Sequence, residues 1–516
     1  MTLARPTAPG ATAVPPLAWR EVSAVAVIVG GVLLARLGRY DIGGDELYFL
    51  TAGRRPAPGY ADQGPLVPML AALSDRLAPG SLVVLRLPVV LATIGGILLS
   101  AATAREFGGG RGPQLLAALA YATTPVAVMQ SAVLSTFALD ITLTATVCWL
   151  FIRWVRIRQD RLLVLAGLAA AVDFQVKWLI PLVWAGLAAG VALFGPRALL
   201  RRPAWWLACA VLSVSALPQL WWQAAHGWPQ LAMGAVVRDE QLATSGGLVA
   251  MPLQVIVTAG PLGVLLLVGM WAGMRSPRLH PYRFLVPLVL LGLAGVVAGG
   301  LRPYFVAGAF PGLFAAGAVY LSEHRLSGRV RMLGAALTAA ATAVAVAAVT
   351  VLPLPESRLR EPTDHYSQLD RRMRLHGPSG WPELVAAVDS AHRALPPRER
   401  AGLLVLTQNY WQAAALDYYG PAAGLPPVYS PNRGYGYFGP PPDSATAVLY
   451  VGVDRPETAL RVAFGATAEL TRRDEPLGFP GVNRAVSVWY CRDPRVPWST
   501  AWPAARTLPL VDGTAR

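Results

Sequence analysis

YDIGGDELYFL, residues 40–50, is the stretch from which the fold of this chain can best be inferred, because three carboxylates follow directly after the first long apolar run at about residues 21–37. They belong to Asp41, Asp45 and Glu46. Paired acids at the end of a membrane helix cost solvation energy and contribute nothing to insertion, so their expected use is chemistry. We therefore predict that Asp45 and Glu46 are catalytic.

The composition is that of a membrane protein. The 516 residues are 54% hydrophobic and only 14% charged. Apolar segments of roughly 18 to 22 residues, long enough to cross a bilayer as helices, recur from residue 21 to about residue 352. The sequence thus predicts an α-helical polytopic membrane protein with about eleven transmembrane helices, near residues 21–37, 82–104, 113–128, 132–152, 161–176, 178–194, 204–222, 250–272, 284–300, 304–321 and 331–352.

The net charge of +15 would suggest a nucleic-acid partner in a soluble chain. Here the arginines gather in short loops between the apolar runs, which is the positive-inside pattern of membrane proteins, so no nucleic-acid partner is expected. The pattern predicts a multi-pass protein of the cell membrane, with a cytoplasmic tail at residues 1–20, a transmembrane domain at 21–352 and a soluble extracytoplasmic domain at 353–516. The basic loops predicted to be cytoplasmic contain Arg105 and Arg111; Arg153, Arg156, Arg158 and Arg161; Arg197, Arg201 and Arg202; Arg275, Arg278 and Arg283; and Arg325, Arg329 and Arg331.

The C-terminal part has a different composition, with more charge, proline and glycine, and its pattern predicts a small α/β domain. Strands are expected within residues 402–408, 427–430, 446–453 and 485–491, and a helix at about 411–419. Between them lies the aromatic, glycine-rich loop SPNRGYGYFGPPP, residues 430–442. It is either a carbohydrate or acceptor platform or a loop packed against its own domain.

The first external loop, at about residues 38–81, is far longer than the others and contains a second polar cluster, YADQGPL, with Asp62 and Gln63. The apolar stretch 66–77 is predicted to lie along the membrane interface as an amphipathic helix, which would let both polar clusters fold back over the helix ends. We predict that Asp62 and Gln63 bind substrate. The alternative is that these acids merely solvate a loop.

Two further segments place polar groups at membrane depth. Asp140 lies about eight residues into a predicted span, or roughly 12 Å at 1.5 Å per residue, so it must be paired, protonated or beside water. In AVDFQVKWLIP, Asp173 and Lys177 interrupt a long apolar run, and Lys177 lies about 24 Å above Arg161, where a helical hairpin would turn at the outer surface. We predict that all three bind substrate. The alternatives are acids satisfied by other helices and a snorkelling lysine.

Three more candidates fall on the same outer side of the membrane. His226 lies at the outer end of the seventh predicted span, and Arg302 and Tyr304 lie in a tight outer turn. Each signal is weak, because tyrosine belongs to interfacial belts and an arginine can snorkel. Together they set cations near anions on one side, so we count them as substrate-binding candidates.

Several motifs resemble a known family in their order and spacing. They are DELYFL, GYADQGPLVP, GGGRGPQLLAALAYATTPV, QLWWQAAHGWPQL and RPYFVAGAFPGLFAAGAV, distributed over most of residues 20–325. Together they are similar to the bacterial glycosyltransferase family 39 group. These enzymes are relatives of the dolichyl-phosphate-mannose protein mannosyltransferases and of the lipid A aminoarabinose transferases, and they have the GT-C membrane fold.

The resemblance implies transfer of a sugar from a polyprenyl-phosphate carrier to a cell-envelope glycan, lipid or protein on the outer side of the membrane. It places the catalytic base on Asp45, with Glu46 beside it, and the family's second acidic position on Asp140. In the aminoarabinose branch a lysine follows the acid of the second cluster, where this chain has Gln63, and an arginine near the first cluster is replaced by Tyr48. Lys177 and Arg302 are then the cations available for the carrier's phosphate, beside a base for the acceptor hydroxyl.

Direct displacement at the sugar would invert its configuration. No cofactor is expected beyond the lipid-linked sugar donor, and the residue types leave a divalent cation open. Two other classes compete: a transporter or flippase of a lipid-linked substrate, which should show internal repeats, and a non-catalytic glycan-binding protein with a decayed membrane site.

Overall fold

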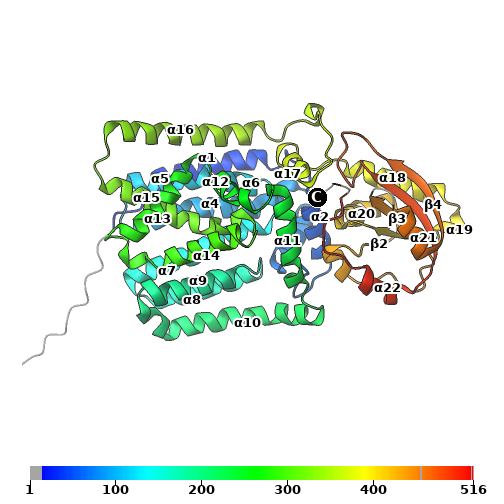
Figure 1. Cartoon of the computed structure of the whole chain (residues 1–516), viewed down its shortest axis with the longest axis horizontal. Coiled ribbons are helices and arrows are strands. Elements are labelled where there is room, and N and C mark those ends of the chain that lie inside the picture. Colours follow the sequence, from blue (N-terminus) through cyan, green and yellow to red (C-terminus); the bar gives the residue numbers. More distant parts are fainter. Residues whose placement is uncertain (1–13, 454–455, 513, 515–516) are drawn as a thin grey trace, which may run out of the picture.

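The computed structural model describes residues 14–453, 456–512 and 514. A bundle of helices runs along the long axis of the molecule, and a mixed α/β region lies at one end of it (Figure 1). The bundle contains α1 (Trp19–Arg36), α4 (Leu82–Glu106), α5 (Arg111–Ala122), α6 (Pro125–Gln130), α7 (Thr136–Ile157), α8 (Arg161–Phe174), α9 (Ile180–Phe194), α10 (Pro203–Ala225), α12 (Met251–Ala259), α13 (Val264–Arg275), α14 (Leu285–Val297), α15 (Phe310–Glu323) and α16 (Gly328–Val351).

The predicted polytopic helical fold is confirmed, and each of the eleven predicted ranges contains helix. Two of the ranges are broken. Thr123 and Thr124 separate α5 from α6, which begins with Pro125, and Gly260, with a left-handed φ of 70°, separates α12 from the turn before α13. Proline and left-handed glycine both end an α-helix, which explains the breaks.

Fewer helices than eleven are long enough to cross a bilayer in one piece. Within the described residues, length and apolar composition select five, and a pair bent by 73° at a short break makes up to six. The five are α4, α7, α10, α16 and the segment Pro303–Glu323 that includes α15. Shorter apolar helices, α9 and α14 among them, account for most of the difference.

The basic loops meet at the end of the bundle that is distant from the α/β region (Figure 1). Glu106 at the end of α4 accepts from Arg153 at 3.4 Å and from Arg156 at 2.5 Å, both at the end of α7. Arg278 pairs with Glu323 at the end of α15. One end of the bundle is therefore rich in arginine, while Asp45 and the α/β region lie at the other.

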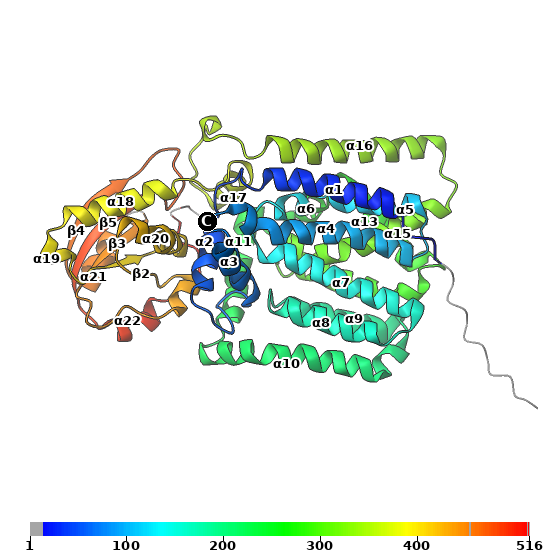
Figure 2. The same ribbon diagram turned by 180° about the vertical axis from the view of Figure 1, so that it is seen from behind.

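The first external loop forms two helices, α2 (Gly44–Gly53) and α3 (Leu66–Leu77), between the bundle and the α/β region (Figure 2). The helix predicted at 66–77 coincides with α3. One face of α3 is buried through Val67, Pro68, Ala71 and Ser74, while Met69, Leu73 and Leu77 are 59, 51 and 71% exposed. An exposed apolar stripe at this spacing is typical of a helix that lies in the membrane interface.

Helix α11 (Pro229–Ser245) was not predicted, because the interval between the seventh and eighth expected spans was interpreted as an outer loop. It is steeply inclined to the bundle and covers the end of the bundle nearest the α/β region (Figure 1). It packs against α17 (Tyr366–Leu375), which belongs to the segment that follows the last bundle helix.

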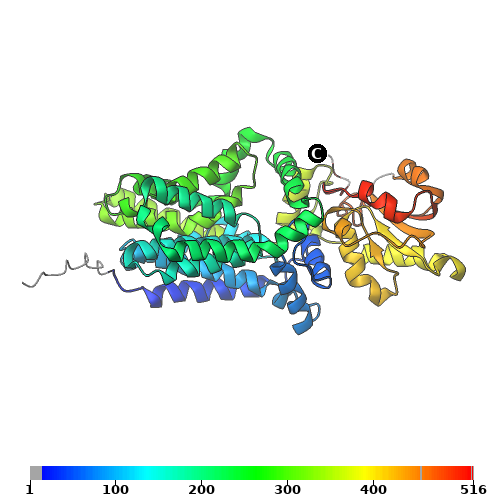
Figure 3. The same ribbon diagram turned by 90° about the horizontal axis from the view of Figure 1, so that it is seen from below.

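The α/β region forms a lobe of its own (Figure 3) around a five-stranded sheet of order β2-β1-β3-β5-β4. β1 pairs in parallel with β2 and β3, and β5 runs antiparallel to β3 and β4. The four expected strands and the helix are present; β4 was missed because its small and polar residues, most of them exposed or half-buried, resemble a loop. The elements are α18 (Trp381–Ala394), α19 (Pro397–Arg400), β1 (Leu404–Thr407), α20 (Tyr410–Ala423), β2 (Val428–Tyr429), β3 (Ala447–Val453), α21 (Glu457–Ala463), β4 (Phe464–Arg473), β5 (Val486–Pro494) and α22 (Trp498–Ala505).

The α/β region and the first external loop share one apolar core. Leu47 and Leu50 of α2 belong to the same buried cluster as Leu416 of α20. Trp381, only 1% exposed, donates from Nε1 to the carbonyl of Ile42 at 2.9 Å. This continuous packing fixes the first turns of α2 and α20 relative to each other.

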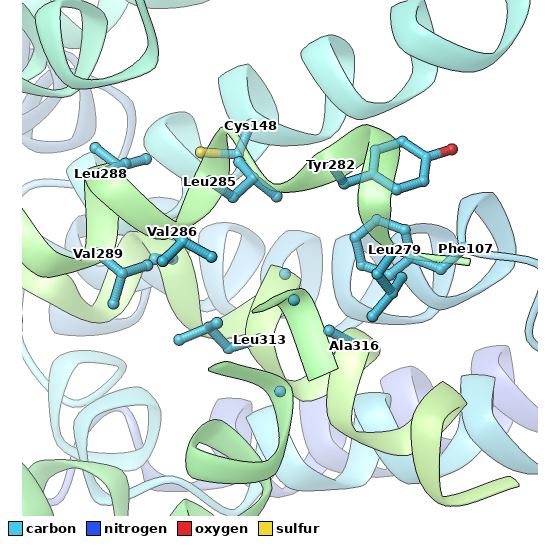
Figure 4. A pocket seen from close by; sticks show the side chains of 14 residues that line it. Phe107, Cys148, Leu279, Tyr282, Leu285, Val286, Leu288, Val289, Leu313 and Ala316 are labelled. Carbon is cyan, nitrogen blue, oxygen red and sulfur yellow. The ribbon is translucent and has the colours of Figure 1, made fainter. Parts of the chain in front are cut away.

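A small hollow within the membrane part is apolar and separate from the polar site described below. It lies among α13, α14 and α15 (Figure 4). Of the side chains labelled in Figure 4, only Cys148 and Tyr282 carry a sulfur or oxygen atom. Such a lining can accept hydrocarbon but cannot position a charged or polar reactant.

Candidate active site

A cavity of about 380 Å³ opens where the bundle meets the α/β region. Four parts of the chain line it: the first external loop, the start of α7 with the α8–α9 turn, α11 with the turn before α15, and the α/β region. Their polar lining residues are Asp45, Tyr48, Asp62, Gln63, Ser135, Thr136, Lys177, Gln230, Arg302, Tyr410 and Arg433.

Asp45 lies in the first turn of α2 and faces this cavity. Its Oδ1 accepts from the Tyr410 hydroxyl at 2.5 Å and from Trp411 Nε1 at 2.9 Å. Oδ2 has no hydrogen-bond partner among the described residues. Gly44 makes this approach of α20 feasible, because a Cβ there would lie 2.3 Å from the Trp411 ring.

Glu46 has different surroundings, and it does not line the cavity. Its two carboxylate oxygens accept from Arg86 Nε and Nη2 at 2.9 and 2.7 Å, and both side chains are almost fully buried. It also accepts from the backbone N–H groups of Gly43 and Leu134. All of its acceptor sites thus face protein donors, which gives Glu46 a structural place rather than the catalytic one expected from its sequence position.

Asp62 and Gln63 line the cavity, as their place in the second polar cluster predicts. The Tyr48 hydroxyl lies 3.4 Å from Asp62 Oδ1. Burial raises the pKa of Asp62, while the nearby Arg433 acts in the opposite direction. The Gln63 amide nitrogen is buried without a hydrogen-bond partner in the described part of the chain. A donor left in this state can bind a ligand oxygen.

The two predicted cations also line the cavity. The predicted hairpin is confirmed, since α8 ends at Phe174 and α9 begins at Ile180, and Lys177 lies in the turn. Its Nζ is 3.5 Å from Thr136 Oγ1 and 4.2 Å from the centre of the Phe137 ring. Arg302 Nη2 lies 3.8 Å from Glu240 Oε2 of α11.

Arg433 is a third cation that the sequence analysis did not single out. Its Nη2 donates to Glu240 Oε1, and its Nη1 lies 3.5 Å from the Tyr410 hydroxyl. Arg433 has a left-handed φ of 46°, which directs the loop into the site. Glu240, 1% exposed, therefore lies between two arginines that both face the cavity.

Loop 430–442 packs against its own domain, which is one of the two roles that its sequence suggested: Trp502 Nε1 donates to the Gly436 carbonyl at 2.8 Å, and the Tyr435 hydroxyl donates to Asp417 Oδ2 at 2.9 Å. The loop also reaches the membrane part. It packs against α2 of the membrane part, where a Cβ on Gly434 would lie 1.8 Å from the Tyr48 hydroxyl oxygen. The Phe438 ring stacks on Tyr48 with centroids 6.2 Å apart. The aromatic residues hold the loop in place, and its arginine enters the cavity. A cation inside such an aromatic loop is the signal that could have revealed it.

Asp140 and Asp173 are buried in the bundle and do not line the cavity. Asp173 Oδ2 accepts from Thr144 Oγ1 at 3.2 Å. Asp140 is 5% exposed and has no ion-pair partner within 4.0 Å among the described residues. Both acids lie on neighbouring helices, α7 and α8, behind the cavity, so the structure does not bring them to the place where a substrate would contact Asp45.

His226 and Tyr304 serve as packing residues around the cavity rather than as part of its lining. The His226 ring stacks on Trp222 at 4.0 Å, and its Nδ1 lies 2.7 Å from the Trp222 carbonyl oxygen. The Tyr304 ring lies 4.1 Å from that of Phe137, the ring beneath Lys177. Tyr304 therefore contacts the ring beneath Lys177 without lining the cavity itself.

The cavity combines one carboxylate with an open oxygen, a half-buried acid and three cations. Such a set can accept a proton at Asp45 and stabilise an anion at Lys177, Arg302 and Arg433. Across the described ranges no group of three or more His, Cys, Asp or Glu side chains has the arrangement of a metal site. The sequence had left a divalent cation open, and the residues give no site to assign to one.

Residues 62–222 match the family model described as dolichyl-phosphate-mannose-protein mannosyltransferase. The comparison with curated protein sequences finds no match. Among solved structures, ArnT from Cupriavidus metallidurans bound to undecaprenyl phosphate is 15% identical, with a TM-score of 0.58. The apo state of that protein is 14% identical, with a TM-score of 0.61. Each alignment covers 92% of this chain and 98% of the other.

Fold and family match together define the class as a membrane glycosyltransferase with the GT-C fold. The family model matches residues 62–222, and the aligned structures extend the same fold over almost the whole chain. The resemblance inferred from the sequence motifs is thereby confirmed.

Proposed function

We propose that this protein transfers a sugar from a polyprenyl-phosphate carrier to a hydroxyl group of a cell-envelope glycan, lipid or protein, at the outer face of the cell membrane. One observation supports the proposal most strongly. Asp45, with an open carboxylate oxygen, lines the same cavity as Lys177, Arg302 and Arg433. A general base and a group of cations are the two requirements for displacing a phosphate leaving group.

In the proposed reaction the acceptor hydroxyl gives its proton to Asp45 Oδ2 as its oxygen bonds to the anomeric carbon. The bond between that carbon and the phosphate oxygen breaks, and its electron pair stays on the leaving phosphate. The cations stabilise this developing charge, and Asp45 then returns its proton to water. Attack opposite to the leaving group inverts the configuration at the sugar, and no second carboxylate is required as a nucleophile.

The chemistry of the site and the chain's similarity to ArnT support a lipid phosphate as the sugar carrier. A lipid phosphate can bring its head group to this cavity from the membrane, because α3 and apolar residues of the cavity wall, Leu179, Leu182 and Leu231, lie at the bundle's outer end. The similar ArnT structure is bound to undecaprenyl phosphate. Glu46 serves in this proposal as the residue that fixes α2 to Arg86, and Asp45 alone acts as base.

The orientation follows from the arginine-rich end of the bundle. The positive-inside rule assigns that end to the cytoplasm. Asp45 and residues 353–516 then face the extracytoplasmic side. A lipid-linked sugar is available on that side without nucleotide hydrolysis.

The test uses the purified full-length protein and a panel of undecaprenyl-phosphate hexoses and pentoses, each incubated with water as the only acceptor. Slow release of undecaprenyl phosphate from at least one donor, lost in the Asp45→Asn variant, is expected. Reconstituted vesicles provide the second measurement. Movement of the intact donor between leaflets, with no cleavage of any donor, would support a flippase and contradict the proposal.

A further inference from the structure

The proposed base, Asp45, receives both of its hydrogen bonds from the α/β region, which is separated from it by more than three hundred residues of sequence. The donors are consecutive residues, Tyr410 and Trp411, in the first turn of α20. Both donate a hydrogen bond to the same oxygen of Asp45, Oδ1. The carboxylate is thus held by two donors at Oδ1, and Oδ2, without a hydrogen-bond partner in the described part of the chain, is the oxygen left for a reactant in the cavity that Asp45 lines.

The two donors are themselves held in place. Tyr410 is 2% exposed and Trp411 is 9% exposed. Asn409, the residue that caps α20, accepts from the Trp411 backbone N–H at 2.6 Å, and Asn432 accepts from the Tyr410 backbone N–H at 3.2 Å. A capped first turn has little freedom, so the side chains that extend from it have defined positions.

The Tyr410 hydroxyl acts as the donor in its hydrogen bond to Asp45. Burial and the charge of Asp45 both raise the pKa of Tyr410, so the phenol keeps its proton and donates it in the hydrogen bond. Arg433 lies over the Tyr410 ring, with Cζ 5.2 Å from the ring centre, and its Nη1 is 3.5 Å from the hydroxyl oxygen. The other charged side chains of the cavity, Asp62, Lys177 and Arg302, come from the membrane part.

We propose that Tyr410 and Trp411 are positioning residues for Asp45, so that the α/β region completes the active site of the membrane part. They hold Oδ1 and turn Oδ2 toward the acceptor hydroxyl. Proton transfer requires heavy atoms about 2.6 to 3.2 Å apart, and a carboxylate free to rotate would spend little time in that geometry. This inference rests on the proposed role of Asp45 as base.

The test compares Tyr410→Phe, Trp411→Phe and the double variant with a Tyr419→Phe control on the same helix. Each is full length, and each is assayed with an undecaprenyl-phosphate sugar that the wild type cleaves. We expect each single change to lower the rate at saturating donor about 10-fold and the double change about 100-fold. Affinity for undecaprenyl phosphate should stay within about 2-fold of the wild type, because no donor contact is removed.

A structural role alone would lower the melting temperature and the affinity along with the rate, and that result would overturn the inference. An unchanged rate at saturating donor would overturn it as well. Tyr410→Phe removes a single oxygen atom, so it remains decisive even where Trp411→Phe fails to fold. A wild type that cleaves no donor would refute the proposed function itself, whereas an active wild type with fully active variants would refute only the role of Tyr410 and Trp411.

Discussion

Arg86 and Glu46 form an ion pair in which Nε and Nη2 of the guanidinium donate to the two carboxylate oxygens at 2.9 and 2.7 Å, away from solvent. The guanidinium also donates to the carbonyls of Leu37, Tyr40 and Asp41. It therefore ties the end of α1 to the start of α2. Asp45 and Glu46 are neighbours in sequence, but their roles differ. Asp45 lines the cavity, whereas Glu46 stabilises the fold.

Replacing Arg86 by leucine should destabilise the protein by about 3 to 5 kcal/mol, because Glu46 would remain buried without its charged partner. Thermal unfolding of the purified protein in detergent measures the loss. Arg54→Ala is the matched control, since Arg54 is 45% exposed and pairs with Asp75 at 3.1 Å, and an exposed pair contributes only about 0 to 1 kcal/mol. Equal stability of the two variants would show that the buried pair has no special role.

Asp45→Asn should abolish sugar transfer and leave the fold intact, because the amide preserves the shape of the side chain but cannot accept the acceptor's proton. The measurement is cleavage of an undecaprenyl-phosphate sugar, together with binding of undecaprenyl phosphate and the melting temperature. Near-normal turnover would remove Asp45 from the role of base, and Asp62 would be the next candidate.

Lys177→Ala and Arg302→Ala should each weaken binding of undecaprenyl phosphate about 10-fold to 150-fold, because a charge-assisted contact contributes roughly 1.5 to 3 kcal/mol. Arg238→Ala is the control, since Arg238 is exposed on α11 and does not line the cavity. Direct binding in detergent is the measurement. If both variants bind as well as the control does, Arg433 is the cation to test next.

Gly434→Ala should separate loop 430–442 from α2, because the added Cβ would lie 1.8 Å from the hydroxyl oxygen of Tyr48, whose side chain is fully buried and has little room to move. Overpacking of this kind costs about 1 to 3 kcal/mol, and it should also lower undecaprenyl phosphate binding by displacing Arg433. The control is Gly112→Ala, at a position with open space around it. A variant with unchanged melting temperature and binding would show that the loop does not depend on this contact.

A reporter enzyme that is active only outside the cytoplasm should be active when fused after Arg516. The arginine-rich end of the bundle determines this expectation through the positive-inside rule. A fusion within the basic loop after Arg158 is the control and should be inactive. The reverse pattern of activities would place the cavity on the cytoplasmic side and would call for a nucleotide-sugar donor.

Much of the fold could be predicted because it depends on local pattern. Apolar length and arginine placement located the helices of the bundle, and α3 coincides with its predicted range, because an apolar stretch between two polar clusters has well-marked ends. The number of full spans could not be predicted as well. Gly260 breaks one apolar run and Thr124 another, and hydropathy averages over such breaks.

The site was only partly predictable, because no local sequence pattern shows which residues far apart in the chain lie close together in the fold. Asp45 and Lys177 could be found from a charge placed where hydropathy disfavours it. Tyr410 and Trp411 could not, because an aromatic pair at the start of a helix is usually core. Glu46 and Arg86 show the converse, since only the structure reveals that an acid beside the proposed base is already neutralised by an arginine from another helix.

The exposed stripe of Met69, Leu73 and Leu77 on α3 has a consequence for which lipid carriers the protein can use. A helix that rests in the interface sets the height of the first external loop, and therefore of Asp45, relative to the lipid head groups. The phosphate of any prenyl carrier lies at that same height, whatever the length of its tail. Carriers that differ by several isoprene units should therefore react at similar rates. The protein should instead select its substrates by the sugar and by the acceptor.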